Sequence, residues 1–219
     1  MNVHYVPLLQ IQRDLYRLPR TQDRFRRYLG TLSPDGNTVE MPPLVFMNPM
    51  AKDHVAALLD SMLALNADAI ASRAVDEACA QTTDAAGDFK IGLVIADDLL
   101  GGWTNRYDGE FNIRFGSAPV NPTTPRPKWL KDYWLTAVCW SSESVTEQSI
   151  REAIQTAVHR QAYVQHHGPA RTLRDKLRQE GQVLQAAGCT GPWFDDEEIA
   201  YTREVLTPFL DADDKRTTI

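Results

Sequence analysis

Two short apolar runs constrain the fold of this 219-residue chain more than any other feature. They are Lys90–Ala96 and Trp134–Trp140, each about as long as one strand and each without regular polar alternation. A strand with apolar side chains on both faces has to be covered on both faces, as in a layered α/β sheet. The sequence therefore predicts strands that lie between layers of helices.

Helical periodicity accounts for much of the remaining chain. Apolar residues spaced by three and four predict helices in the first thirty residues, which Pro19 interrupts, and further helices up to about Gln81. Three more helices are expected after the second apolar run, over 146–167, from Pro169 to Gly188, and over 195–210. The C-terminal half is therefore predicted to be rich in helix.

Two other segments predict additional strands. Leu44–Met47 is a short apolar run, and Trp103–Phe115 ends in an alternation of aromatic or aliphatic residues with polar ones, which indicates a half-exposed strand near a sheet edge. The overall prediction is an α/β or α+β fold, with a single domain over residues 1–210 and a mixed sheet of about four strands packed among helices. Residues 211–219 are expected to form a frayed tail.

Composition excludes some classes of protein. No apolar run reaches the roughly 18–20 residues that cross a bilayer, so a membrane protein is not expected. The net charge of −6 makes nucleic acid an improbable main partner, because nucleic-acid affinity depends largely on basic residues. Three cysteines, an odd number, favour a reducing cytoplasm. No motif identifies a reaction or a cofactor, so no cofactor is expected and enzymatic activity stays open.

The densest group of chemically capable side chains follows the first apolar run. Ligands of open α/β sheets bind beyond the carboxyl ends of the strands, which is where this group begins. We therefore predict a pocket for a small polar or anionic ligand at the turn 97–107, walled by the proline-rich segment 116–128. Its predicted ligand-binding residues are Asp97, Asp98, Trp103, Asn105, Arg106 and His159.

Each residue of this hypothesis has an expected role. Arg106 would bind an anionic group, and Asp97 or Asp98 would accept hydrogen bonds or act as a base. His159, from the helix predicted over 146–167, would join the wall of the pocket. The alternative is an ordinary turn in which Arg106 pairs with Asp98, since aspartate and glycine are common turn residues.

The helix over 146–167 raises the question of a metal. His159 and His166 share one face but lie seven residues apart, about 10.5 Å along the axis, which is too far for two ligands of one zinc ion. The stretch His159–Tyr163 has the frame of the His-Glu-x-x-His motif, but Arg160 replaces the base and Tyr163 the second ligand. A degenerate metallohydrolase-like scaffold without metal is therefore one alternative, and a solvated or interface face is another.

The N-terminal helices carry an arginine stripe. Its members are Arg13, Arg17, Arg20, Arg24 and Arg27, with Arg26 adjacent to the stripe. A continuous ridge of this kind could bind an acidic partner, but Pro19 breaks its register, so we expect a solvated face that pairs with acidic residues of the same chain, including Asp195–Glu198. As an alternative function, the amphipathic helices predict a non-catalytic interaction module, most simply a homodimer.

Overall fold

A parallel sheet of three strands forms the centre of the computed structural model, which describes residues 1–99, 105–116, 127–190 and 194–212. The strands are β1 (Asn2–Tyr5), β2 (Asp88–Ala96) and β3 (Trp134–Trp140), in that spatial order. Ile91 of β2 pairs with Tyr5 on one side and with Leu135 on the other. Because β2 is paired on both edges and covered on both faces, nearly all of its side chains are buried and apolar.

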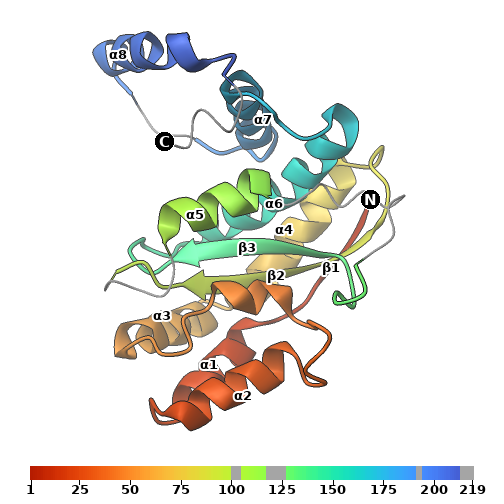
Figure 1. The fold of residues 1–219 in the computed structure, drawn as a ribbon, viewed down its shortest axis with the longest axis vertical. Coiled ribbons are helices and arrows are strands. Elements are labelled where there is room, and N and C mark those ends of the chain that lie inside the picture. The colour runs from red at the N-terminus through yellow and green to blue at the C-terminus, as the bar shows by residue number, and fades with distance from the viewer. Residues whose placement is uncertain (100–104, 117–126, 191–193, 213–219) are drawn as a thin grey trace.

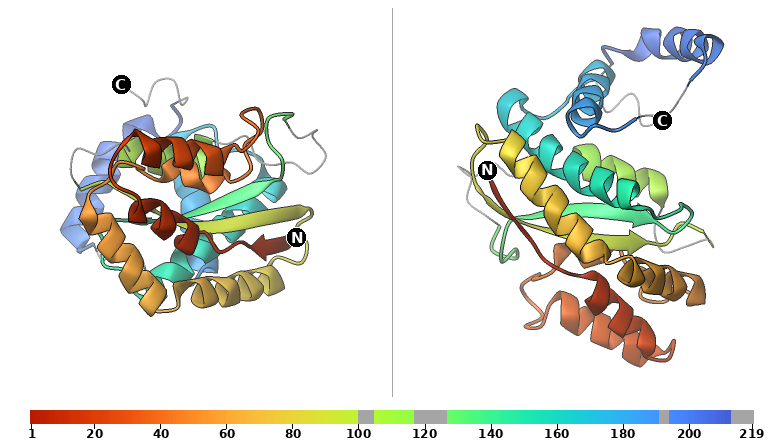
Figure 2. Two further views of the ribbon diagram at one scale, coloured as in Figure 1. Left: turned by 90° about the horizontal axis from the view of Figure 1, so that it is seen from below. Right: turned by 180° about the vertical axis from the view of Figure 1, so that it is seen from behind.

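Helices cover both faces of the sheet (Figures 1 and 2). On one face α4 (Ala67–Gln81) packs beside α6 (Glu147–His167), and these two helices contact β1 and β3 respectively. The other face is covered by α1 (Leu9–Arg17) and the short 3-10 helix η1 (Pro42–Phe46), with α3 (Asp53–Ala64) packed on α1. The two apolar runs of the sequence thus form the sandwiched strands that their pattern predicts.

Close packing on β2 depends on a glycine. A Cβ atom at Gly92 would lie 2.4 Å from the Cδ1 atom of Leu8 and 3.3 Å from the ring of Pro43. Both neighbours belong to the layer formed by α1 and η1. Gly92 therefore sets how closely this layer approaches the sheet.

The remaining helices extend the molecule in opposite directions from the sheet. At one end α2 (Gln22–Leu32) packs on α1, whereas α7 (Leu173–Ala186) packs on α6 at the other. Beyond α7 lie α8 (Asp196–Leu206) and the 3-10 helix η3 (Thr207–Phe209), far from α2 (Figure 1). Next to β3 are α5 (Arg106–Phe111) and a π-helical turn, η2 (Asn112–Gly116).

A glutamine side chain completes one edge of β2. Strand β1 is shorter than β2, so the backbone N–H and carbonyl groups of Ile95 have no β1 residue opposite them. The fully buried amide of Gln12 takes that place, donating to the Ile95 oxygen at 2.7 Å and accepting from the Ile95 nitrogen at 3.0 Å. Gln12 therefore substitutes for a strand residue and satisfies backbone groups that would otherwise be buried without partners.

The structure corrects several predictions. The sheet has three strands, not four, and is parallel, not mixed. The run Leu44–Met47 lies largely in η1, since the prolines before it lack N–H groups for a ladder. Residues 106–115 of the predicted strand Trp103–Phe115 lie in α5 and η2. There the helical spacing prevails, because Phe111 and Phe115 are neighbours across one turn, with ring centroids 5.6 Å apart.

Of the predictions for the first thirty residues, one is confirmed and one is wrong. The break at Pro19 is confirmed, since α1 ends at Arg17 and α2 begins at Gln22. Residues 2–5, however, form β1 and are not helical. Most of the predicted tail, 213–219, lies outside the described residues.

The arginine stripe pairs with acidic residues of the same chain, as predicted, but these are not Asp195–Glu198. Arg13, Arg17 and Arg26 form ion pairs with nearby aspartates of α3, α1 and α2, respectively Asp60, Asp14 and Asp23. Arg24 is buried and donates to the carbonyl oxygen of Leu18. Residues 195–198 lie at the opposite end of the molecule, so they do not reach these arginines within one chain (Figure 1).

The helices that the structure describes differ in length and apolar content. No single one is both long and apolar enough to cross a bilayer. The bent pair formed by α3 and α4, whose axes meet at 65°, passes the same requirements of length and composition.

Candidate functional site

The carboxyl end of β2 opens into a network of polar side chains centred on Asp97. Only 3% of Asp97 is exposed. One carboxylate oxygen lies 2.8 Å from Nε2 of His54 and 3.1 Å from the hydroxyl of Ser141, and the other accepts from the amide of Asn48 at 3.1 Å. The backbone N–H of Leu99 donates to the first of these oxygens, the one near His54, at 3.3 Å. A buried carboxylate with four donors around it is fixed in position.

These donors determine the charge of Asp97. Burial opposes ionisation, but hydrogen bonds from His54, the Leu99 amide and Asn48 outweigh it, so the pKa of Asp97 lies below its usual range. An ionised carboxylate can only accept hydrogen bonds, so Nε2 of His54 must carry a proton. In the neutral imidazole, Nδ1 then remains as an acceptor. The network therefore orients a histidine in the first turn of α3.

Asp98 continues the network toward β3. Its carboxylate accepts from the backbone N–H of Ser142 at 2.9 Å and from the Ser142 hydroxyl at 2.7 Å. The hydroxyl of Ser141 lies 3.1 Å from both Asp97 and Asp98 and so links the two carboxylates. Despite partial burial, the serine hydrogen bonds and the charge of Arg106 hold the pKa of Asp98 below its usual range. Both aspartates are therefore anionic at neutral pH.

Arg106 ends this chain of contacts at the first residue of α5. Its guanidinium lies 3.3 Å from Asp98, contacts Glu143, and sits 5.3 Å from the ring centroid of Trp140. Although desolvation acts in the opposite direction, the hydrogen bond and charge of Glu143 and the charge of Asp98 raise the pKa of Arg106. The predicted turn pairing of Arg106 with Asp98 is thus present, as one part of a larger network.

A cavity of about 450 Å³ begins where this network ends. It lies between β3, α5, η2, α6 and α7. Its lining includes both charged and aromatic side chains. Among them are Arg106, Glu110, Arg114, Trp140, Glu152 and Arg160.

The charges in this cavity are largely paired with one another. Arg160 donates to both oxygens of Glu180 at 2.8 and 2.9 Å, and Arg114 bridges Glu180 and Glu110 at 2.9 and 2.8 Å. Burial opposes ionisation of Glu180, but Arg160 and Arg114 keep its pKa below the usual range. The carboxylate of Glu152 has no arginine or lysine partner among the described residues. The cavity therefore combines fixed cations with one carboxylate available to a ligand.

The predicted site residues fall into three groups. Asp97, Asp98 and Arg106 are joined in one network, and Asn105 is adjacent, where its side chain caps α5 by accepting from the N–H of Tyr107. His159 is buried on α6, its Nε2 has no hydrogen-bond partner among the described residues, and it does not line the cavity. Burial lowers the pKa of His159. Trp103 and most of the proline-rich segment lie outside the described residues.

Sequence reasoning missed the partners that other parts of the chain supply, which are Asn48 and His54 as well as Ser141, Ser142 and Glu143. Asn48 and His54 reach Asp97 from before and within α3, 49 and 43 residues away along the chain. No spacing rule connects residues that far apart. The only available signal was a cluster of polar residues near a predicted helix start, which ordinarily marks a helix cap.

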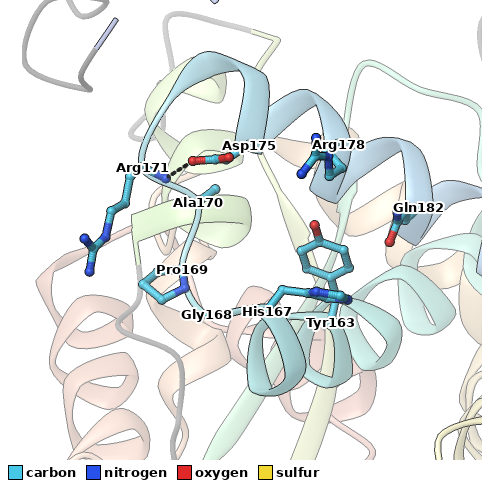
Figure 3. A pocket seen from close by; sticks show the side chains of 9 residues that line it. All are labelled: Tyr163, His167, Gly168, Pro169, Ala170, Arg171, Asp175, Arg178 and Gln182. Carbon is cyan, nitrogen blue, oxygen red and sulfur yellow. Dashed lines mark hydrogen bonds between the residues drawn. The ribbon is translucent and has the colours of Figure 1, made fainter. Parts of the chain in front are cut away.

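A second cavity, of about 590 Å³, lies between the end of α6 and the start of α7 (Figure 3). The rings of Tyr163 and His167 are 4.3 Å apart on its α6 side, while Arg178 and Gln182 project from α7. At the start of α7 the N–H of Thr172 donates to Asp175, the N–H of Asp175 donates to the Thr172 hydroxyl, and the N–H of Arg174 donates to the carbonyl oxygen of Leu210. This cavity has no connection to the strand ends, so the cavity beside Arg106 is the stronger candidate.

The described part of the chain contains no cluster of three or more His, Cys, Asp or Glu side chains arranged to hold a metal ion. Neither a protein-family model nor any curated protein or solved structure matches the sequence or the fold. The site therefore has to be interpreted from its own chemistry.

Proposed function

We propose that the protein binds a small polar ligand with an anionic group in the cavity beside Arg106. The observation that carries this proposal is that the two acidic partners of Arg106 differ in their exposure to solvent. On one side it is held by the buried Asp98, and on the other by Glu143, whose side chain is 53% exposed. A solvent-exposed ion pair contributes little energy, so a ligand carboxylate or phosphate can replace Glu143 without displacing the arginine.

The remaining lining supports the same class of ligand. A volume of about 450 Å³ falls within the range of small-molecule sites. Glu152 can accept a hydrogen bond from a hydroxyl or ammonium group of the ligand, and Arg106 can bind its anion. A ligand with both kinds of group, such as an amino acid or a hydroxy acid, fits this distribution of charge.

A second candidate function is general acid–base catalysis at the same edge of the sheet. The observation that favours it is the imidazole of His54, oriented by the ionised Asp97. Asp97 itself is already saturated with donors, so His54 is better suited than Asp97 to exchange a proton.

We also propose a reducing compartment such as the cytoplasm, because Cys79, Cys139 and Cys189 are all free thiols.

Thermal-shift measurements with amino acids, hydroxy acids, dicarboxylic acids and phosphate monoesters test the binding proposal. A ligand at 100 times its Kd stabilises the native state by about 2.7 kcal/mol. We expect Arg106→Ala to abolish the shift. Arg73→Ala, which removes a 62% exposed arginine of α4, is the matched control and should retain it. A ligand whose shift survives Arg106→Ala, or a full panel without any shift, would argue against this site.

A further inference from the structure

Helix α8 exposes an apolar face that nothing in the described chain covers. It has no buried residue. Phe194, just before the helix, is 54% exposed, and Leu177 on the neighbouring α7 is 47% exposed. An 11-residue helix is marginal in water unless an apolar face is packed. Helix α8 therefore presents a surface that requires a partner.

This surface combines an apolar groove with an acidic edge. The groove has a volume of about 290 Å³ and is lined mainly by aliphatic and aromatic side chains of α7, α8 and the residues beside them, among them Leu177, Phe194, Ile199, Leu206 and Leu210. Four consecutive acidic residues, 195–198, begin α8 next to the groove. Asp195 and Glu198 cap the helix, whereas Asp196 and Glu197 have no ion-pair partner within the described ranges.

Helix α2 presents the complementary combination at the opposite end of the molecule (Figure 1). Leu29 is 45% exposed there, one turn after Arg26 on the same side of the helix, whereas Arg27 is exposed on the other side. Arg26 pairs only with side chains of its own helix, Asp23 and Gln22, and Arg27 has no ion pair with any residue that the structure describes. An exposed leucine is thus bordered by Arg26, whose ion pair with Asp23 is itself exposed to solvent.

We propose that the α8 surface of one copy docks on α2 of a second copy. Leu29 would enter the groove, and Asp196 and Glu197 would face Arg26. One contact then accounts for the groove, for the exposed leucine and for the two carboxylates of α8 that have no ion-pair partner in the described ranges. Because the two surfaces lie at opposite ends, they cannot meet within one chain, and the contact between copies must be head-to-tail.

This arrangement predicts a distinct assembly behaviour. In a head-to-tail contact each copy keeps one unused surface, so association continues beyond a dimer unless a ring closes. Light scattering and sedimentation at 1–100 μM, on the order of typical self-association constants, should give a mass above 24.7 kDa that rises with concentration. High salt should lower it, because the charged border of the contact is screened.

Charge reversal provides the decisive test. Asp196→Lys/Glu197→Lys and Arg26→Glu should each weaken self-association by more than about tenfold, because like charges then face each other. An equimolar mixture of the two variants should associate again, since each lysine-bearing α8 then meets a glutamate-bearing α2. Arg73→Glu is the matched control, because it reverses an exposed arginine of α4 remote from both surfaces.

Separate measurements show whether the variants are folded. All three reversed side chains are exposed, so circular dichroism and the melting temperature should stay close to those of the parent chain. Leu29→Ser tests the apolar part and should weaken association without altering any charge. A parent protein that is monomeric at 100 μM, variants that associate like the parent, or a mixture that stays monomeric would each overturn the proposal, as would binding of RNA or another protein to either surface of a monomeric chain.

Discussion

The Nε2 atom of His54 lies 2.8 Å from a carboxylate oxygen of Asp97, which ties the first turn of α3 to the carboxyl end of β2. Both residues occupy the edge of the sheet at which parallel α/β folds bind ligands. The contact places an ionised, buried carboxylate behind a partly exposed imidazole. The contribution of this contact to stability should therefore fall when acid protonates Asp97.

We expect Asp97→Asn to destabilise the fold by about 2–4 kcal/mol at pH 7, because several donors lose a charged acceptor. The folded pKa of Asp97 is depressed, so its contribution is present above the unfolded value of about 3.9 and is lost as the pH falls through the folded value. Urea unfolding at pH 7 and pH 3 should show a smaller penalty in acid. Asp76→Asn, at an exposed position of α4, should change stability by less than about 0.5 kcal/mol at either pH. An equal penalty for Asp97→Asn at both pH values would contradict this account.

Gln12→Leu should cost about 2–4 kcal/mol, because it leaves the buried N–H and carbonyl of Ile95 without partners. Leucine is close to glutamine in volume, so packing alone predicts a much smaller change. Chemical denaturation measures the difference, with Gln10→Leu on the exposed side of α1 as the control. A cost below about 1 kcal/mol would mean that another group replaces the amide.

Gly92→Ala should destabilise by about 1–3 kcal/mol through overpacking against Leu8. Combining it with Leu8→Ala should relieve the overlap, so the double variant should lose less than the sum of the two single changes. Gly30→Ala in α2, where a Cβ atom would meet nothing within 4 Å, should instead leave stability unchanged or raise it slightly. Calorimetric unfolding of the four variants tests both the sign and the coupling.

Arg160→Met should destabilise by about 3–5 kcal/mol at neutral pH, because Glu180 loses its bidentate partner in a largely buried position. Glu180→Gln in the same chain should recover part of that loss. The folded pKa of Glu180 is lowered, so the ion pair contributes above about pH 4.3 and fades as the pH falls further. Denaturation at pH 7 and pH 3 should therefore show a much smaller effect of Arg160→Met in acid.

The sequence predicts the elements with strong patterns and fails where patterns compete. The sandwiched strands β2 and β3 and the long helix α6 follow directly from their apolar residues. Strand β1 has only four residues, too few for alternation to stand out against the helix signals that follow it. In α5 and η2, residues two apart suggested a strand, whereas the contacts four apart, such as Glu110 with Arg114, determine the structure.

The candidate site could be predicted from the sequence only in part. Asp97, Asp98 and Arg106 could be proposed because they follow a predicted strand within ten residues. Their link to Ser141 depends on the register of β2 and β3, which pairs Ala96 with Trp140 and which no local pattern specifies. His54 comes from a distant helix, so only the folded chain brings it to Asp97.

The side chain of Gln12 has a consequence beyond stability. Unpaired backbone groups along a strand are a template on which another polypeptide can add itself as a further strand. By occupying the Ile95 groups, the amide of Gln12, together with α1, ends the growth of the sheet on that side. Loss of this amide would therefore leave the N–H and the carbonyl of Ile95 open to pairing with another polypeptide strand.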